Sequence, residues 1–136
     1  MGTRRKAREA ALQMLYQMDL SGVSAESAVS LFWEHLGGTR DGEEFANALV
    51  VGFGREASRI DETIRQVSQH WRLERMARVD RNILRLGTYE ILAMADVPRR
   101  VTINEAVELA KRFGNETSAG FVNGVLDKIA SDVGKA

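Results

Sequence analysis

The densest cluster of positive charge lies at the start of the chain, where it could bind phosphate groups. Four of the six residues in segment 3–8 are cationic: Arg4, Arg5, Lys6 and Arg8. The following residues, 9–16, are rich in Ala, Leu, Met and Gln, which favour helix, so we expect the cluster to open a helix. Cations in a first helical turn cost roughly a few tenths of a kcal/mol each. A phosphate-binding helix start and a solvated terminus with incidental charge both remain open interpretations.

The remaining chemically active side chains do not converge on a catalytic or metal site. His35 and His70 fall on different predicted helices, and neither belongs to a recognisable metal-binding motif. The segment Gly52–Gly54 contains a Gly-x-Gly, but it lies in a helical pattern and follows no predicted strand, unlike a phosphate-binding loop. We therefore expect no enzyme activity, no metal and no cofactor.

Composition indicates one globular domain spanning residues 1–136. Basic and acidic residues number 19 each; residues 1–9 hold four basic and one acidic residue, a net charge of +3, so the remainder carries −3. Any polyanion site must therefore be a local patch. The chain has no cysteine, which fits a reducing compartment. It also has no apolar run long enough for a signal peptide or a membrane span, so we expect a cytoplasmic protein.

Helical periodicity dominates the chain, which has a single proline and almost no strand-like alternation. The pattern predicts an all-α fold of about seven helices. The first two helices are expected over about 5–20 and 25–36, and two more within 43–69 with a bend near Ala57. A central buried helix is expected over 72–95. Two further helices follow, one capped by Thr102 and Glu105 and the last capped by Ser118.

Five arginines recur every three or four residues in the predicted central helix: Arg72, Arg75, Arg78, Arg81 and Arg85. This spacing aligns them along part of one helical face. A solvated or ion-paired face is the commoner explanation of such a row, and a ligand site is the alternative. Gly87 lies in the middle of the same pattern, where it costs about 1 kcal/mol against Ala unless another segment packs closely against it.

Three segments together resemble the NusB family of bacterial transcription antitermination factors. They are Arg4–Tyr16, Val79–Glu90 and Val97–Asp127, the last including Ile103–Gly114 and Phe121–Asp127. The resemblance covers essentially the whole chain and is weakest between Ser21 and Gly42. It implies a compact single domain of about seven helices in two small packed bundles.

The resemblance also implies a binding function. Family members bind boxA single-stranded RNA together with the ribosomal protein NusE, within the RNA polymerase antitermination complex. They support transcription of rRNA operons and rRNA maturation. Some relatives self-associate, so a homodimer remains open.

The resemblance assigns two sets of residues. Those implied to bind RNA are Arg4, Arg5, Lys6, Arg8, Tyr16, Asn115, Thr117, Ser118 and Phe121, and those implied to bind NusE are Asp80, Arg81 and Leu84. Thr117 stands where some members have an aspartate, which removes one anion from the neighbourhood of the phosphates. Tyr16 and Phe121 fit either base stacking or an inward helical stripe, and both interpretations stay open.

Two other functions are compatible with the sequence. The chain could be a protein-interaction adaptor whose basic start is incidental, or an accessory domain of an rRNA methyltransferase system without RNA specificity of its own. A helix-turn-helix DNA reader is disfavoured, because no helix with base-reading polar residues follows a short turn.

Overall fold

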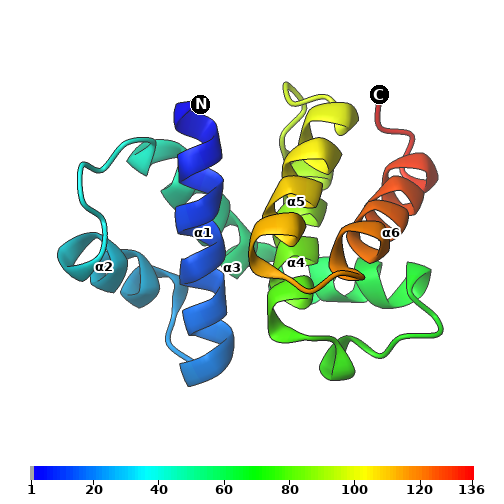
Figure 1. Ribbon diagram of the computed structural model, residues 1–136, viewed down its shortest axis with the longest axis horizontal. Coiled ribbons are helices and arrows are strands. Elements are labelled where there is room, and N and C mark those ends of the chain that lie inside the picture. Colours follow the sequence, from blue (N-terminus) through cyan, green and yellow to red (C-terminus); the bar gives the residue numbers. More distant parts are fainter. Residues whose placement is uncertain (1) are drawn as a thin grey trace. The chain divides into compact units, whose positions relative to one another are not determined.

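The computed structural model describes residues 2–136, and α-helices account for most of them (Figure 1). The elements are α1 (Thr3–Ser21), α2 (Ala25–His35), α3 (Glu43–Val67), the 3-10 helix η1 (Leu73–Arg75), α4 (Arg78–Ala93), α5 (Arg99–Phe113) and α6 (Ser118–Asp132). No strand occurs within the described residues, so the predicted all-α class is confirmed. Residues 2–136 form six α-helices and one 3-10 helix, where about seven helices were expected.

The chain forms two compact units, Met1–Arg55 and Glu56–Ala136. The N-terminal unit holds α1, α2 and the first half of α3. The C-terminal unit holds the rest of α3 together with η1, α4, α5 and α6. In Figure 1 these units run from blue to cyan-green and from green to red.

The N-terminal unit has an apolar core to which all three of its helices contribute. Its buried side chains include Ala7, Ala11, Met14, Leu15, Ala28, Phe32, Trp33, Ala46, Leu49 and Val50. The connection into α3 passes very close to the start of α1. A Cβ on Gly42 would lie 2.8 Å from both the Ala7 methyl group and the Thr3 carbonyl oxygen, and Gly42 has a φ of 73°. Only glycine fits this position, so Gly42 sets the distance between the connection and the basic cluster.

In the C-terminal unit, α4 is the central helix, with buried residues on several faces. The α5 helix contributes Ile103, Ala106, Leu109 and Ala110 to the core, and α6 contributes Val122, Leu126 and Ile129. One buried polar contact also joins two helices, because the Thr102 hydroxyl donates to Glu90 Oε1 over 3.0 Å.

The predicted capping box, in which Thr102 caps the start of α5, was wrong. The α5 helix begins earlier, at Arg99, with Pro98 in the N-cap position at a φ of −64°. The fixed φ of proline suits a helix start, so the helix is already under way at Thr102. Its buried hydroxyl satisfies Glu90 instead of a free amide of the first turn.

Three other predicted boundaries were wrong. Residues 43–67 form one continuous helix without a break near Ala57, and Asp61 within it pairs with Arg85. The central helix begins at Arg78 and not near residue 72, since the preceding arginines lie in η1 and its flanks. Ser118 is the first residue of α6, and Thr117 occupies its N-cap position.

Close packing explains the glycine in the middle of α4. A Cβ on Gly87 would lie 2.7 Å from one methyl carbon of Leu126 and 3.0 Å from the other. Leu126 is itself fully buried in α6, so it has little room to move away. The absence of a side chain at Gly87 therefore lets α4 and α6 approach each other.

We expect Gly87→Ala to lower the free energy of unfolding. Overpacking against Leu126 costs about 1–3 kcal/mol, which outweighs the gain of about 1 kcal/mol in helix propensity. The matched control is Gly124→Ala in α6, where an added Cβ meets nothing within 4 Å, and we expect it to stabilise the protein. Chemical denaturation measures both changes, and an equal stabilisation by the two variants would contradict the packing argument.

Candidate nucleic-acid interface

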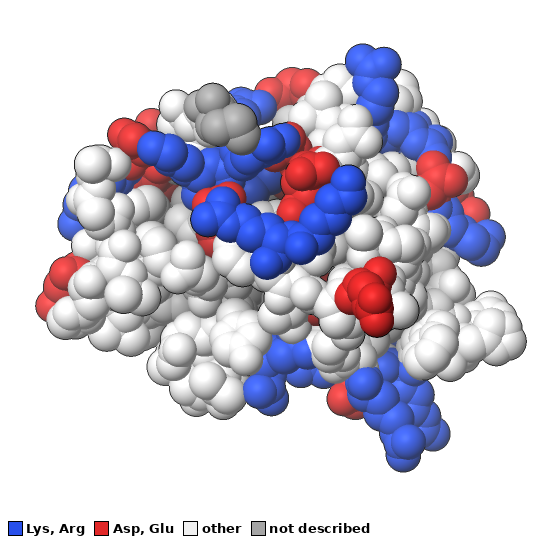
Figure 2. All heavy atoms as spheres, in the orientation of Figure 1, with Lys and Arg blue, Asp and Glu red and all other residues white. Residues whose placement is uncertain are grey.

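The basic residues of segment 3–8 lie in the first two turns of α1. Figure 2 shows Lys and Arg side chains together with Asp and Glu side chains on this face of the molecule. Arg4 is exposed, and its guanidinium carbon lies 4.4 Å from the centroid of the Phe45 ring. Lys6 is exposed and its Nζ is 3.5 Å from Asp41 Oδ2. An ion pair as exposed as this one contributes little and can exchange with solvent or a ligand.

Arg8 differs from its neighbours because its side chain is buried. It is only 4% exposed, and its guanidinium carbon lies 5.2 Å from the same Phe45 ring. Arg8 has further interactions within the protein, as does the half-buried Arg5. Arg8 therefore supports the basic cluster from inside, while Arg4 and Lys6 present their charges to solvent.

The first turn of α1 is open to an anion. Gly2 occupies the N-cap position without a side-chain hydrogen bond, and the turn contains no acidic residue. The leading amides of a helix that lack intrahelical acceptors carry partial positive charge and favour phosphate or carboxylate ligands. The amides and the exposed cations thus favour the same kind of ligand.

Tyr16 lies two turns beyond the basic cluster on α1, and its side chain is 36% exposed. The ring is therefore neither a core residue nor fully in solvent. An amphipathic ring with this exposure can pack on one side and contact a ligand on the other.

The connection between α5 and α6 is held by its own polar side chains. Asn115 Oδ1 accepts hydrogen bonds from the Thr117 amide at 2.9 Å and from the Thr117 hydroxyl at 2.8 Å. The buried Ser118 hydroxyl accepts from the Asn115 amide at 3.0 Å. Ser118 therefore has a structural role, whereas Asn115 and Thr117 are exposed. The exposed Glu116 gives the connection an anion, so it offers little attraction to phosphates.

An aromatic pair lies in the same unit as this connection. The half-buried Phe121 ring meets the Trp71 ring edge to face, with centroids 6.1 Å apart and planes at 74°. Trp71 is 64% exposed. The sequence patterns assigned no role to Trp71, which lies between the helices expected within 43–69 and over 72–95. The available signal was a tryptophan flanked by His70 and Arg72 at the junction of two predicted helices.

The residues expected to bind NusE lie mostly inside the C-terminal unit. Leu84 is fully buried, and Asp80 and Arg81 are more than nine-tenths buried. Arg81 donates from Nη1 to the Leu73 carbonyl over 3.0 Å. Within the described residues Asp80 Oδ1 is buried without a hydrogen-bond partner. Any partner contact here would use the exposed margins of Asp80 and Arg81, with Leu84 as core support.

The arginine row of the sequence divides into structural and exposed members. Arg85 forms a two-pronged ion pair with Asp61, from Nε to Oδ1 and from Nη2 to Oδ2, both at 2.9 Å, and its Nη1 donates to Asn82 Oδ1 at 3.1 Å. Arg72 and Arg75 are exposed. The ion-paired interpretation thus holds for Arg85.

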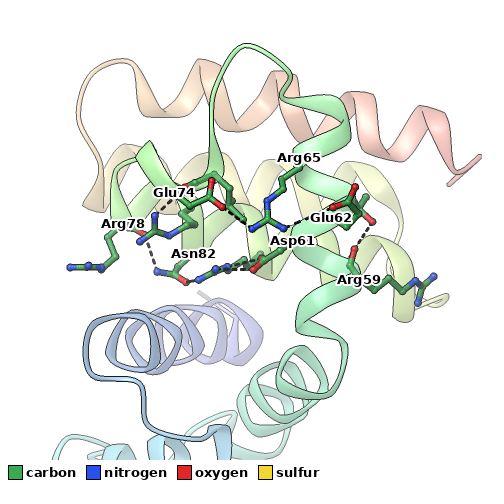
Figure 3. Close-up of polar contacts among 11 residues, drawn as sticks. Arg59, Asp61, Glu62, Arg65, Glu74, Arg78 and Asn82 are labelled. Carbon is green, nitrogen blue, oxygen red and sulfur yellow. Dashed lines mark hydrogen bonds and ion pairs between the residues drawn. The ribbon is translucent and has the colours of Figure 1, made fainter.

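A second ion pair fastens η1 to α3. Arg65 Nη2 lies 2.9 Å from Glu74 Oε2 (Figure 3). The pKa of the Glu74 carboxyl is lowered, first by a hydrogen bond from its own backbone amide and then by Arg65. The pKa of Arg65 is raised, chiefly by its hydrogen bond to Glu74. Because the folded-state pKa of Glu74 is the lower one, its contribution to stability is present above the unfolded-state pKa and is lost as the pH falls through the folded-state value.

We expect Arg65→Gln to raise the pKa of Glu74 part of the way toward its ordinary value. The shift is only partial because the backbone hydrogen bond to Glu74 remains. Carboxyl-detected NMR titration measures this pKa directly. As a control, Arg59→Gln removes an ion pair with Glu56 and should leave the Glu74 pKa unchanged. An unaltered Glu74 pKa in Arg65→Gln would show that Arg65 does not lower the pKa of Glu74.

No helix within residues 2–136 combines the length and apolar character needed to cross a membrane. In that same range no group of three or more His, Cys, Asp or Glu side chains could hold a metal ion.

Comparison with known proteins gives consistent matches along the chain. The model of the NusB family matches residues 5–131. A transcription antitermination protein NusB from Sorangium cellulosum is 52% identical and covers 99% of this chain and 96% of its own. The solved NusB of T. maritima has a TM-score of 0.85 at 39% identity, covering 95% of this chain and 91% of that one. NusB in a solved complex of antitermination factors NusB and NusE with double-stranded RNA has a TM-score of 0.83 at 31% identity, covering 96% and 97%.

Proposed function

Because the chain belongs to the NusB family, we propose that it is a transcription antitermination factor that binds boxA single-stranded RNA together with ribosomal protein NusE. In this role it supports transcription of rRNA operons and rRNA maturation in the cytoplasm, as a binding protein and not as an enzyme. A solved complex of a related NusB with NusE and double-stranded RNA supports NusE and RNA as the two partners.

The observation that carries the RNA-binding part is the uncapped, cationic first turn of α1. The first turn of α1 carries cations but no acidic residue and no side-chain cap. These cations interact unfavourably with the positive end of the helix dipole. A bound phosphate removes that conflict, because it accepts from the free amides and pairs with the exposed charges of Arg4 and Lys6. Arg5 and Arg8 add positive potential from less exposed positions.

Phosphate contacts of this kind anchor an RNA strand without reading its sequence. Sequence preference requires contacts with unstacked bases, through aromatic rings and base edges. Tyr16, Phe121 and the connection formed by Asn115, Thr117 and Ser118 are the proposed reading groups. The NusE contact is proposed for the surface around Asp80 and Arg81, supported from the core by Leu84.

We expect Arg4→Ala/Lys6→Ala to weaken boxA binding and to make it less dependent on salt. Each phosphate contact on a single strand contributes about 0.7 to the slope of log affinity against log salt, so losing two contacts should reduce that slope by about 1.4. Between 50 and 200 mM salt, four contacts predict an affinity loss of about fiftyfold and two contacts one of about sevenfold. Gel-shift titrations in the presence of NusE, at several salt concentrations, measure the slope.

The matched control is Arg55→Ala/Lys128→Ala, which removes two exposed cations outside the proposed site. Its salt slope should stay at the wild-type value, and circular dichroism should show both double variants fully helical. Equal slopes for the two double variants would refute the phosphate-anchor role of α1. If wild-type protein binds NusE but prefers boxA no more than scrambled RNA, the adaptor alternative holds.

A further inference from the structure

We propose that Trp71, oriented by Phe121, is a stacking surface for one unpaired base of the bound single-stranded RNA. The inference rests on the proposed function and extends it, because it adds a base-contacting residue outside the set assigned by the sequence.

The exposure of Trp71 is the first observation. The chain has two tryptophans, of which one is buried and the other exposed. Trp33 is 7% exposed, and its indole N–H donates to Asn47 Oδ1 over 2.7 Å. Trp71 is 64% exposed, so folding leaves most of a large apolar ring in water. A ligand that covers this ring recovers the hydrophobic free energy that folding does not.

The geometry of the ring is the second observation. Trp71 and Phe121 meet edge to face at 6.1 Å, so the two rings do not stack on each other. The main chain around Trp71 is also held, because its amide donates to the Ser68 carbonyl at 2.9 Å and the Ser68 hydroxyl donates to the Ile64 carbonyl at 2.6 Å. Two residues further on, Leu73 is buried in the core. An exposed ring on such a constrained segment loses little entropy when a base stacks on it.

The charge around Trp71 favours a nucleic acid over an apolar protein segment. Arg72 and Arg75 are exposed neighbours in sequence. The one acid between them, Glu74, is paired with Arg65. Trp71 is also the only large exposed hydrophobic residue of segment 68–77. A single exposed aromatic among arginines matches the aromatic and cationic surfaces that hold single strands, whereas a protein-docking patch is a contiguous apolar area.

Fluorescence tests the contact directly. Stacking of a base on Trp71 should quench indole emission when a boxA oligonucleotide is added to the complex of this chain with NusE. In Trp71→Phe, the emission from this chain comes from Trp33 alone, and the quenching attributable to Trp71 should vanish. Equal quenching in the wild type and in Trp71→Phe would overturn the proposal.

Binding measurements with substituted proteins and RNAs test the energetics. We expect Trp71→Leu, which keeps an apolar side chain but no ring, to bind boxA about 5- to 150-fold more weakly. Trp71→Phe should retain most of the affinity. A series of boxA oligonucleotides, each with one abasic position, should then contain one member that weakens binding to the wild type but not to Trp71→Leu. Additive losses at every position would mean that Trp71 stacks on no base.

The outcomes separate this inference from the proposed function. If the wild type binds boxA with a salt slope that depends on Arg4 and Lys6, but Trp71→Leu binds equally well, only the stacking surface is refuted. If Trp71→Leu loses affinity for NusE and not for RNA, Trp71 is a protein contact and the inference is wrong. If the wild type shows no preference for boxA over scrambled RNA, both proposals fall.

Discussion

In the C-terminal unit, a two-pronged ion pair between Asp61 and Arg85 constrains how α3 and α4 pack against each other. It joins α3 to α4 through two contacts of 2.9 Å, with both side chains largely shielded from water. Removing one partner would leave a charge without compensation in a poorly hydrated place. The connection that carries Trp71 runs between these two helices, and the Arg65–Glu74 ion pair ties it to α3 as well. Arg85, a member of the arginine row in the sequence, thus joins α3 to α4 in this unit.

The N-terminal unit uses positive charge in a different way. Burial of Arg8 beside Phe45 brings a cation under the start of α1, and the tight approach at Gly42 keeps the following connection against the same turn. The cost of placing cations at a helix start is therefore built into the packing of the unit. A ligand with negative charge would lower that cost.

Features that depend on the periodicity of apolar residues were predicted well from the sequence. Features that depend on which group a polar side chain hydrogen-bonds with were predicted less well. The helical class and the extents of α1 and α2 follow from apolar spacing and glycine stops. The predicted cap at Thr102 was wrong because its side chain has a tertiary partner, Glu90. Spacing does not reveal whether an aromatic residue near a helix end is buried, so Trp71 was assigned no role.

The charge balance of the chain limits what its basic start can contribute to specificity. Outside residues 1–9 the chain carries a net charge of −3, so a strand of RNA meets repulsion over much of the remaining surface. The connection before α6 adds the exposed Glu116 and contributes no cation. The base contacts proposed there would have to offset unfavourable electrostatics, and stacking on an aromatic ring is a contact that does not depend on charge.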